Sequence, residues 1–198
     1  MVRRGLLRFW RDQSGLSLVE GVLVLPIVIL VSAVMIEFGA AVHQYNQAVQ
    51  AMHLGARLAA VSDPLVPLTA FEDTPGIEEG QPTPRAPLSI TCTSNSDPPC
   101  NAAGLNRLVN GAGSTVGMSR VSPLIGPENV SVTYFRSGLG FVGRPTGPVV
   151  TVVVELRDVT FDLFLLGRLL GVNNLPIPTS PVAFTSEDLR TACPGCSS

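Results

Sequence analysis

Hydrophobic residues are concentrated in one long stretch near the start of the chain. From Val22 to Ile36 no residue is charged, and from Leu16 to Val42 only Glu20 and Glu37 are ionisable. At about 1.5 Å per residue, a helix over this stretch is long enough to cross a hydrocarbon core of about 30 Å. The pattern predicts a single transmembrane helix, with a local kink at Pro26, which removes one backbone hydrogen bond.

The helical pattern continues beyond the apolar stretch to about residue 60. Small or apolar residues recur at spacings of three and four, and polar residues occupy the other faces. Residues 16–60 are therefore predicted to form one helix whose second half projects from the membrane and packs on another part of the protein. The recurring positions are Ala41, Tyr45, Ala48, Met52, Ala56 and Ala59, and the polar ones are His43, Gln44, Gln47, Gln50, His53 and Arg57.

A short basic leader, residues 1–15, precedes this helix. It contains four arginines and one aspartate, which makes its net charge +3 although the whole chain carries −2. Short basic flanks stay on the cytoplasmic side of a membrane, so we expect the N-terminus inside and the chain beyond about Val42 outside. A secretory signal peptide would end in a small-x-small cleavage site after roughly 7–15 apolar residues, and the continuous helical pattern does not fit that design. No basic cluster outside the leader suggests binding to nucleic acid.

An acidic residue, Glu20, stands at the start of the apolar stretch, where ionisable groups are costly and usually paired or functional. One interpretation places it at the headgroup boundary, where it costs little. The other depends on Gly15, five residues earlier, because cleavage after Gly15 would make Leu16 a new N-terminus with a positive amine. Glu20 would then be the fifth residue, and its carboxylate could neutralise the amine of a neighbouring subunit. Packed apolar helices would otherwise bury that charge unpaired.

Three motifs follow the leader in a fixed order: EGVLVLP at residues 20–26, EFG at 37–39 and GARLAA at 55–60. Over about its first 60 residues the chain resembles the TadE-like minor pseudopilins of the tight-adherence (Tad or Flp) type IV pilus system. The resemblance implies that a prepilin peptidase cuts after Gly15, that Leu16 becomes the mature N-terminus, and that Glu20 acts in assembly. It also implies that other pilins or pseudopilins and the inner-membrane pilus platform are partners, and that the protein assists assembly or priming of a pilus.

The rest of the chain divides at about residue 101. Residues 61–101 are rich in proline with little periodicity, which predicts a long irregular connection. Residues 102–198 are predicted to form a small exported α+β domain, in which a short antiparallel sheet packs against a helix.

Within this domain a helix is expected over residues 102–116, which Gly111 and Gly113 are expected to end early. Strands are expected at 130–135, 148–156 and 182–189, with a hairpin loop rich in glycine and proline between the first two. Residues 161–170 are expected to form a short apolar helix or a loop.

Four cysteines lie in the part of the chain that is expected to be exported. Disulfides are the default expectation there because the compartment outside the inner membrane is oxidising. Four cysteines allow three pairings, and the sequence alone does not choose among them. The local pairs are favoured: Cys92 with Cys100, and Cys193 with Cys196.

Several motifs that suggest chemistry are better explained structurally. Residues 138–143 match the dinucleotide-binding fingerprint, but the proline-containing segment after them cannot form the helix that would receive a pyrophosphate. The CPGC motif at 193–196 lacks the following helix of redox dithiols, and the separation of Cys92 and Cys100 does not suit zinc. His43 and His53 are ten residues apart, and the sequence contains no esterase, metalloprotease or phosphate-binding motif. We therefore expect no enzymatic activity, no cofactor and no metal site.

The sequence favours a structural protein of the bacterial inner membrane, with one membrane span, a cytoplasmic N-terminus and an exported C-terminal domain that is either retained there or incorporated into a pilus. One alternative stays open. The chain could be an uncleaved single-pass envelope protein whose outer domain binds a ligand or a partner protein. The two hypotheses differ in whether the chain is cut after Gly15 and whether Glu20 is needed.

Overall fold

In the computed structural model of the protein, the described residues are 14–72, 75–97, 99–145, 147–161, 163, 167, 171, 175–178, 180–186 and 189. The chain forms two compact units, which are treated separately. Residues 1–42 and 162–175 belong to the anchor unit, and residues 43–161 and 176–198 belong to the globular unit.

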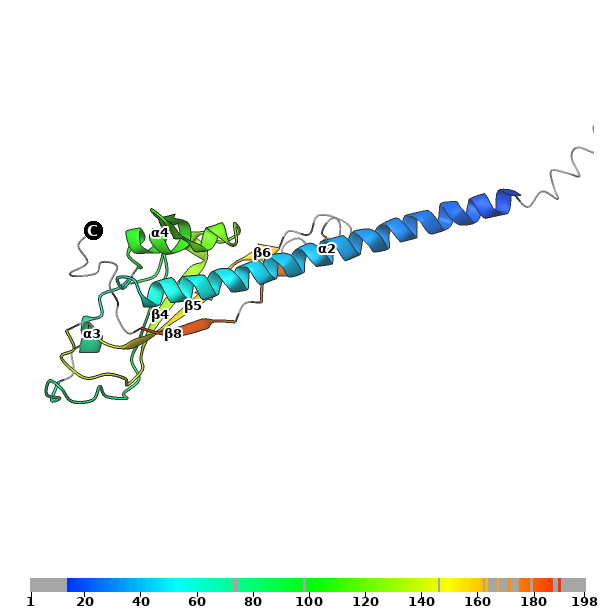
Figure 1. The fold of residues 1–198 in the computed structure, drawn as a ribbon. Helices are drawn as coiled ribbons and strands as arrows, with labels where there is room; N and C mark the ends of the chain where they lie inside the picture. Colours follow the sequence, from blue (N-terminus) through cyan, green and yellow to red (C-terminus); the bar gives the residue numbers. More distant parts are fainter. Residues whose placement is uncertain are drawn as a thin grey trace, which may run out of the picture. The chain divides into compact units, whose positions relative to one another are not determined.

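One long helix, α2 (Ser14–Ala60), contributes residues to both units (Figure 1). Its 47 residues include Pro26, and helical residues continue on both sides of this proline. The long N-terminal helix predicted over residues 16–60 is therefore confirmed. The local kink at Pro26 stays a prediction.

The globular unit is built on a four-stranded antiparallel sheet with the strand order β1-β4-β5-β8. In β5, buried and half-buried residues alternate along the whole strand, as expected when only one face of a sheet is covered. Together with the helices this sheet gives the α+β architecture that the sequence predicts. The strands are β1 (Ser89–Cys92), β4 (Val130–Arg136), β5 (Val150–Leu156) and β8 (Val182–Thr185).

Three of these strands, β4, β5 and β8, lie in segments where strands are predicted, although β8 ends at Thr185. Strand β1 differs from the prediction, because it lies inside the segment 61–101 that was expected to be irregular. It is only four residues long and follows a proline-rich stretch, so its local pattern is weak. Antiparallel pairing with β4 supplies the hydrogen bonds that make it a strand.

Helix α4 (Ala102–Asn110) buries Leu105, Leu108 and Val109, which form its apolar stripe. It ends at Gly111, whose φ of 83° lies in the left-handed region that favours glycine. The predicted early end of this helix is confirmed. The remaining elements are α3 (Thr69–Glu72), β2 (Gly111–Ala112), β3 (Thr115–Val116), η1 (Met118–Arg120), η2 (Pro127–Asn129), β6 (Thr160–Phe161) and β7 (Leu175–Pro176).

The second half of α2 packs into the core of the globular unit through small side chains. Ala48, Ala51 and Ala56 are fully buried, and so is nearly all of Met52. Gly55 faces Met118 so closely that a Cβ atom added at Gly55 would overlap the methionine side chain. Of the polar residues of this segment, His43, Gln50, His53 and Arg57 are exposed, whereas Gln44 and Gln47 are half-buried. The predicted amphipathic continuation of the helix is therefore confirmed.

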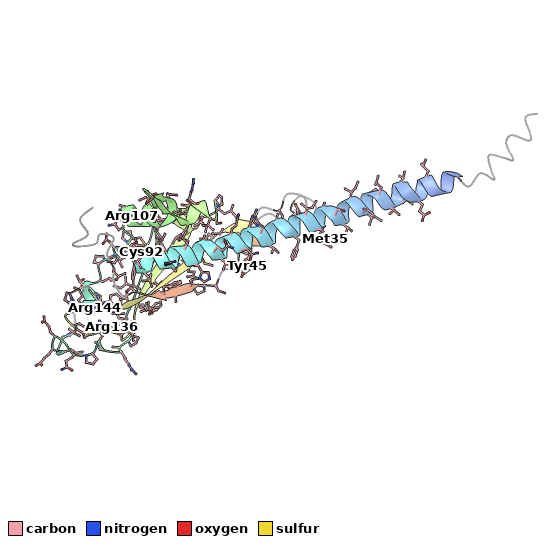
Figure 2. The ribbon with its side chains drawn as sticks, viewed as in Figure 1. Met35, Tyr45, Cys92, Arg107, Arg136 and Arg144 are labelled. Carbon is pink, nitrogen blue, oxygen red and sulfur yellow. A yellow bond between two sulfur atoms is a disulfide. The ribbon has the colours of Figure 1, made fainter. Side chains whose placement is uncertain are left out.

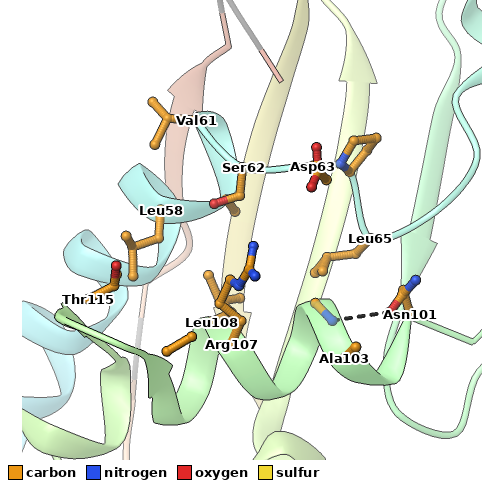
Figure 3. Close-up of a pocket in the computed structure, with 14 residues that line it drawn as sticks. Leu58, Val61, Ser62, Asp63, Leu65, Asn101, Ala103, Arg107, Leu108 and Thr115 are labelled. Atoms are coloured by element: carbon orange, nitrogen blue, oxygen red, sulfur yellow. Dashed lines mark hydrogen bonds between the residues drawn. The ribbon is translucent and has the colours of Figure 1, made fainter. Parts of the chain in front are cut away.

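The chain that leaves α2 is held in place at Leu65 (Figure 3). The Leu65 N–H donates to the Tyr134 hydroxyl on β4 at 3.0 Å, and the Leu65 carbonyl accepts from the Asn101 N–H at 2.7 Å. Asn101 also caps α4, because its Oδ1 accepts from the Gly104 N–H at 3.1 Å. One residue thus connects the end of α2 to the sheet and to the start of α4.

A disulfide joins Cys92, the last residue of β1, to Cys100, which lies directly before the cap of α4. Both cysteines are buried, and the Cys100 N–H donates to the Thr93 carbonyl at 2.9 Å. The bond therefore fixes the end of a short edge strand to the start of a helix. Cys193 and Cys196 lie outside the described residues, as does most of the segment 161–170, so the expectations for them stay predictions.

Candidate functional site

The described part of α2 begins at Ser14, and Gly15 and Leu16 are helical in it. Side chains of residues 14–17 lie outside the described set. The structure therefore places the bond at which the sequence suggests cleavage on α2.

Glu20 lies on α2, and its side chain is exposed. It forms no ion pair with any other residue of the described part of the chain. Its neighbours Leu18 and Val22 are also exposed, by 69% and 60%. A carboxylate on such an apolar surface needs a positive partner once other apolar helices or lipid surround it.

The first half of α2 presents apolar side chains on all sides. The helix that is apolar enough to cross a membrane covers Leu18–Ala60. None of the residues in its most apolar 18-residue stretch is buried. Met35 and Ile36 are exposed by 68% and 73%, and Figure 2 shows Met35 projecting from the helix. The Ser32 hydroxyl donates to the Val28 carbonyl at 2.8 Å, so this polar group is satisfied within the helix.

This one helix is long and apolar enough to cross a membrane, and no other helix in the described part of the chain meets that condition. At about 1.5 Å per residue, the uncharged residues 21–36 extend over about 24 Å. With their flanks they match a hydrocarbon core of about 30 Å. Exposed apolar side chains of this size in water would be strongly unfavourable, and a bilayer or packed apolar helices remove that cost.

Residues 15–57 match the family model of TadE-like proteins. The N-terminal segment of the chain is TadE-like. This match confirms the resemblance inferred from the three sequence motifs. No curated protein and no solved structure matches the chain.

The TadE-like segment lies entirely within α2 and includes both the exposed apolar half and most of the half that packs on the sheet. The GARLAA motif, which begins inside this segment at Gly55 and continues past it to Ala60, has a clear structural explanation. Gly55 permits the close contact with Met118, Ala56 and Ala59 are buried, and Arg57 points to solvent near the end of the helix. There its charge is favourable for the helix dipole.

Beyond the TadE-like segment, the glycine-rich residues 138–143 belong to the connection between β4 and β5. Gly138, Gly140 and Gly143 all have positive φ. The loop pairs with residues 80–83, since the Val142 carbonyl accepts from Gly80 and the Val142 N–H donates to Gln81. This segment is thus a turn-rich hairpin loop, and no helix follows it before β5.

The His43 ring lies 3.0 Å from the Gln47 side-chain amide, one helical turn away on α2. Among the described residues, no three histidine, cysteine, aspartate or glutamate side chains gather as metal ligands would.

A cavity of about 520 Å³ lies between the end of α2 and α4, and its lining residues include Leu58, Asp63 and Arg107 but neither histidine nor cysteine (Figure 3).

One buried group of the globular unit, the hydroxyl of Tyr134, has a strongly shifted pKa. Burial raises the pKa of Tyr134 to about 12, and the hydrogen bond from the Leu65 N–H opposes this shift more weakly. The hydroxyl is thus held neutral and acts as a hydrogen-bond acceptor within the fold. Sequence reasoning identified Gly15, Leu16 and Glu20 but not Tyr134, whose position in an alternating strand signals only burial.

Proposed function

We propose that this protein is a minor pseudopilin-like structural component of a Tad-type pilus, anchored in the bacterial inner membrane by α2 with its globular unit exported. One observation carries the proposal. The TadE-like helix presents an exposed carboxylate, Glu20, with no ion-pair partner among the described residues, five residues after the Gly15–Leu16 bond. The role is structural and needs no cofactor.

In the proposed sequence of events, a prepilin peptidase cuts the bond after Gly15 and leaves Leu16 as the N-terminus. The new α-amine carries a positive charge that is costly among apolar helices. Glu20 of a neighbouring pilin-like subunit neutralises it, so the two charges stabilise side-by-side packing of the helices.

Cleavage is testable with unusual selectivity, because all 13 basic residues of the chain are arginine and none is lysine. The α-amine at the N-terminus is therefore the only primary amine. Full-length protein is expressed with a prepilin peptidase, labelled with an amine-reactive reagent and digested, and mass spectrometry identifies the labelled residue. The proposal expects the label on Leu16.

Two variants complete this experiment. Gly15→Val should retain the leader and move the label to Met1. Gly21→Ala is the matched control, because a Cβ atom at Gly21 meets nothing within 4 Å, and it should be cleaved normally. An intact N-terminus in the wild-type protein, despite an active peptidase, would contradict the pseudopilin role and favour an uncleaved anchor with a binding domain.

A further inference from the structure

The cavity between the end of α2 and α4 has the size and the walls of a small-molecule site. Its volume is about 520 Å³, and ligand pockets usually measure about 300–1,000 Å³. The described residues of its lining all belong to the globular unit, so the site does not depend on how the two units are placed. Most of these residues are apolar, and they include Leu58, Val61, Leu65 and Leu108.

The walls of this cavity are held in place by the fold itself. The Leu65 backbone makes hydrogen bonds with the Tyr134 hydroxyl and the Asn101 N–H, and the Asn101 side chain caps α4. Leu65 and Leu108 are buried in the core of the unit. A site that is formed before its ligand arrives loses little conformational entropy on binding.

Arg107 supplies the charge that is available in the cavity. Its side chain is exposed, and Figure 3 shows it extending from α4 toward the segment 61–65. It forms no ion pair with another residue of the described part of the chain. Asp63 also lines the cavity but has an interaction partner of its own. The charge that remains for a ligand is therefore positive.

Hydrogen-bond donors accompany this charge. The Asn101 Oδ1 atom already accepts from the Gly104 N–H, so the side-chain amide of Asn101 still offers its two N–H groups. Ser62 and Thr115 add hydroxyl groups to the lining. A carboxylate suits this set, because it accepts hydrogen bonds only and its single negative charge balances one guanidinium. A phosphate dianion would leave one charge unbalanced beside apolar walls.

We propose that this cavity binds an organic acid with a short apolar group, whose carboxylate pairs with the Arg107 guanidinium. The apolar group covers Leu58 and Val61, of which Val61 is 56% exposed without a ligand. A free acid and the last residue of a peptide present the same chemistry. The inference goes beyond the pseudopilin role, because it concerns the globular unit and does not depend on cleavage after Gly15.

Saturation-transfer NMR on the full-length protein in detergent measures the binding. The probes are isocaproate, which is a free acid, and N-acetyl-leucine, which resembles the end of a peptide. The amide of N-acetyl-leucine is the control, because it has nearly the same shape but no charge. We expect a Kd of about 1 mM for an acid and binding at least about tenfold weaker for the amide.

The two acids distinguish the sources of the ligand. Binding of isocaproate shows that a free acid is sufficient, whereas binding of N-acetyl-leucine alone identifies a peptide end. The uncharged amide enters detergent micelles more readily than the acids, so uptake by micelles cannot imitate the expected order. Equal binding of the acids and the amide, or no binding of either acid, overturns the proposal.

A matched pair of arginine variants tests the charge. Arg107→Gln should weaken binding of the acid by at least about tenfold, because the charge-assisted hydrogen bonds are lost. Arg85→Gln should bind as wild type does, because Arg85 is exposed but does not line the cavity. Equal affinities of the two variants overturn the role of Arg107. Displacement of the acid by an equal concentration of inorganic phosphate overturns the choice of a carboxylate.

A second pair of variants tests the place of binding without changing charge. Ala102 and Ala103 are exposed neighbours on α4, but only Ala103 lines the cavity. Ala103→Leu should weaken binding by roughly fivefold because its side chain occupies the space of the ligand, whereas Ala102→Leu should not. Equal affinities of this pair overturn the site, and unfolding curves verify that all variants are folded. Gly15→Val should bind the acid normally, so binding and cleavage are judged separately.

Discussion

At the scale of single residues, the position of Glu20 on an apolar helix determines which partner its carboxylate needs. Its carboxylate is exposed on an apolar helix surface and has no ion-pair partner among the described residues. Replacement by alanine removes a charge that is unfavourable in a bilayer, so insertion of the anchor should not suffer. Assembly should suffer, because the amine of a neighbouring subunit then lacks its counter-charge.

We therefore expect Glu20→Ala to lower pilus formation by at least about tenfold, the effect of losing about 1.4 kcal/mol from each subunit contact, while the amount of membrane-inserted protein stays at the wild-type level. Electron microscopy measures the pilus yield, and membrane fractionation of the same cells measures the amount of inserted protein. Normal pili from the variant would show that Glu20 lies harmlessly at the headgroup boundary.

Tyr134 makes the stability of the globular unit depend on alkaline pH. Its pKa is raised to about 12 in the folded protein, whereas an unfolded tyrosine titrates near 10. Between these values the unfolded state has released a proton that the folded state keeps. The stabilisation is complete below about pH 10 and decreases by about 1.4 kcal/mol per unit as the pH rises toward 12.

Tyr134→Phe should remove this slope and, at neutral pH, lower the free energy of unfolding by about 1–3 kcal/mol, because the buried Leu65 N–H loses its acceptor. Denaturant unfolding followed by circular dichroism at pH 8 and pH 11 measures both effects. An unchanged slope in the variant would show that another group causes the alkaline loss.

At the scale of elements, the contact between α2 and the sheet depends on small side chains. Gly55 and Gly39 lie on the same helix, but only at Gly55 would an added side chain overlap another residue, Met118. Met118 is fully buried and has little room to move. Gly55→Leu should therefore destabilise the globular unit by about 2 kcal/mol through overpacking.

Gly39→Leu is the matched control, because a Cβ atom at this position meets nothing within 4 Å. It should leave the unfolding of the globular unit unchanged. Both variants are compared with wild type by denaturant unfolding in the same detergent. Equal stability of the two variants would mean that α2 does not pack on Met118 as described.

The disulfide between Cys92 and Cys100 stabilises the weakest strand of the sheet. It closes a short loop, with a sequence separation of 8. Loop-closure entropy for this length predicts that the double variant Cys92→Ala with Cys100→Ala loses roughly 2.5 kcal/mol of stability. Hydrogen exchange should show the largest loss of protection in β1. Reductant should destabilise the wild type by a similar amount and leave the double variant nearly unaffected, which isolates this bond from the other two cysteines.

The elements differ in how far their sequence predicts them. Strands β4 and β5 have seven residues each; burial alternates along the whole of β5 and over Val132–Phe135 of β4, so much of their pattern is visible without the structure. Gly111 marks the end of α4 because a left-handed residue is needed there. The local sequence does not predict strand β1, since its pairing partner lies about 40 residues away. The edges of the sheet could not be predicted, because an edge is a property of strand order and not of any one strand.

At the scale of the whole molecule, the TadE-like match and the division into units follow different boundaries. The match ends at residue 57, close to the end of α2, whereas the boundary between the units falls at residue 42. The TadE-like segment therefore contains the apolar anchor and also the face that packs on the globular unit. Sequence reasoning recovered this segment well, because apolar composition and helical spacing are both local signals.

The stripe of alanine and glycine on α2 has a consequence for how such a protein diversifies. A helix face made mostly of alanine and glycine around Met52 imposes few shape requirements on what covers it, so many different folds could be fused behind the same anchor. New outer domains could then be exchanged by recombination near residue 60 while the apparatus that handles the helix stays the same. For protein engineering, residues 16–60 offer a ready-made display stem, to which a designed domain with a flat apolar surface could be attached.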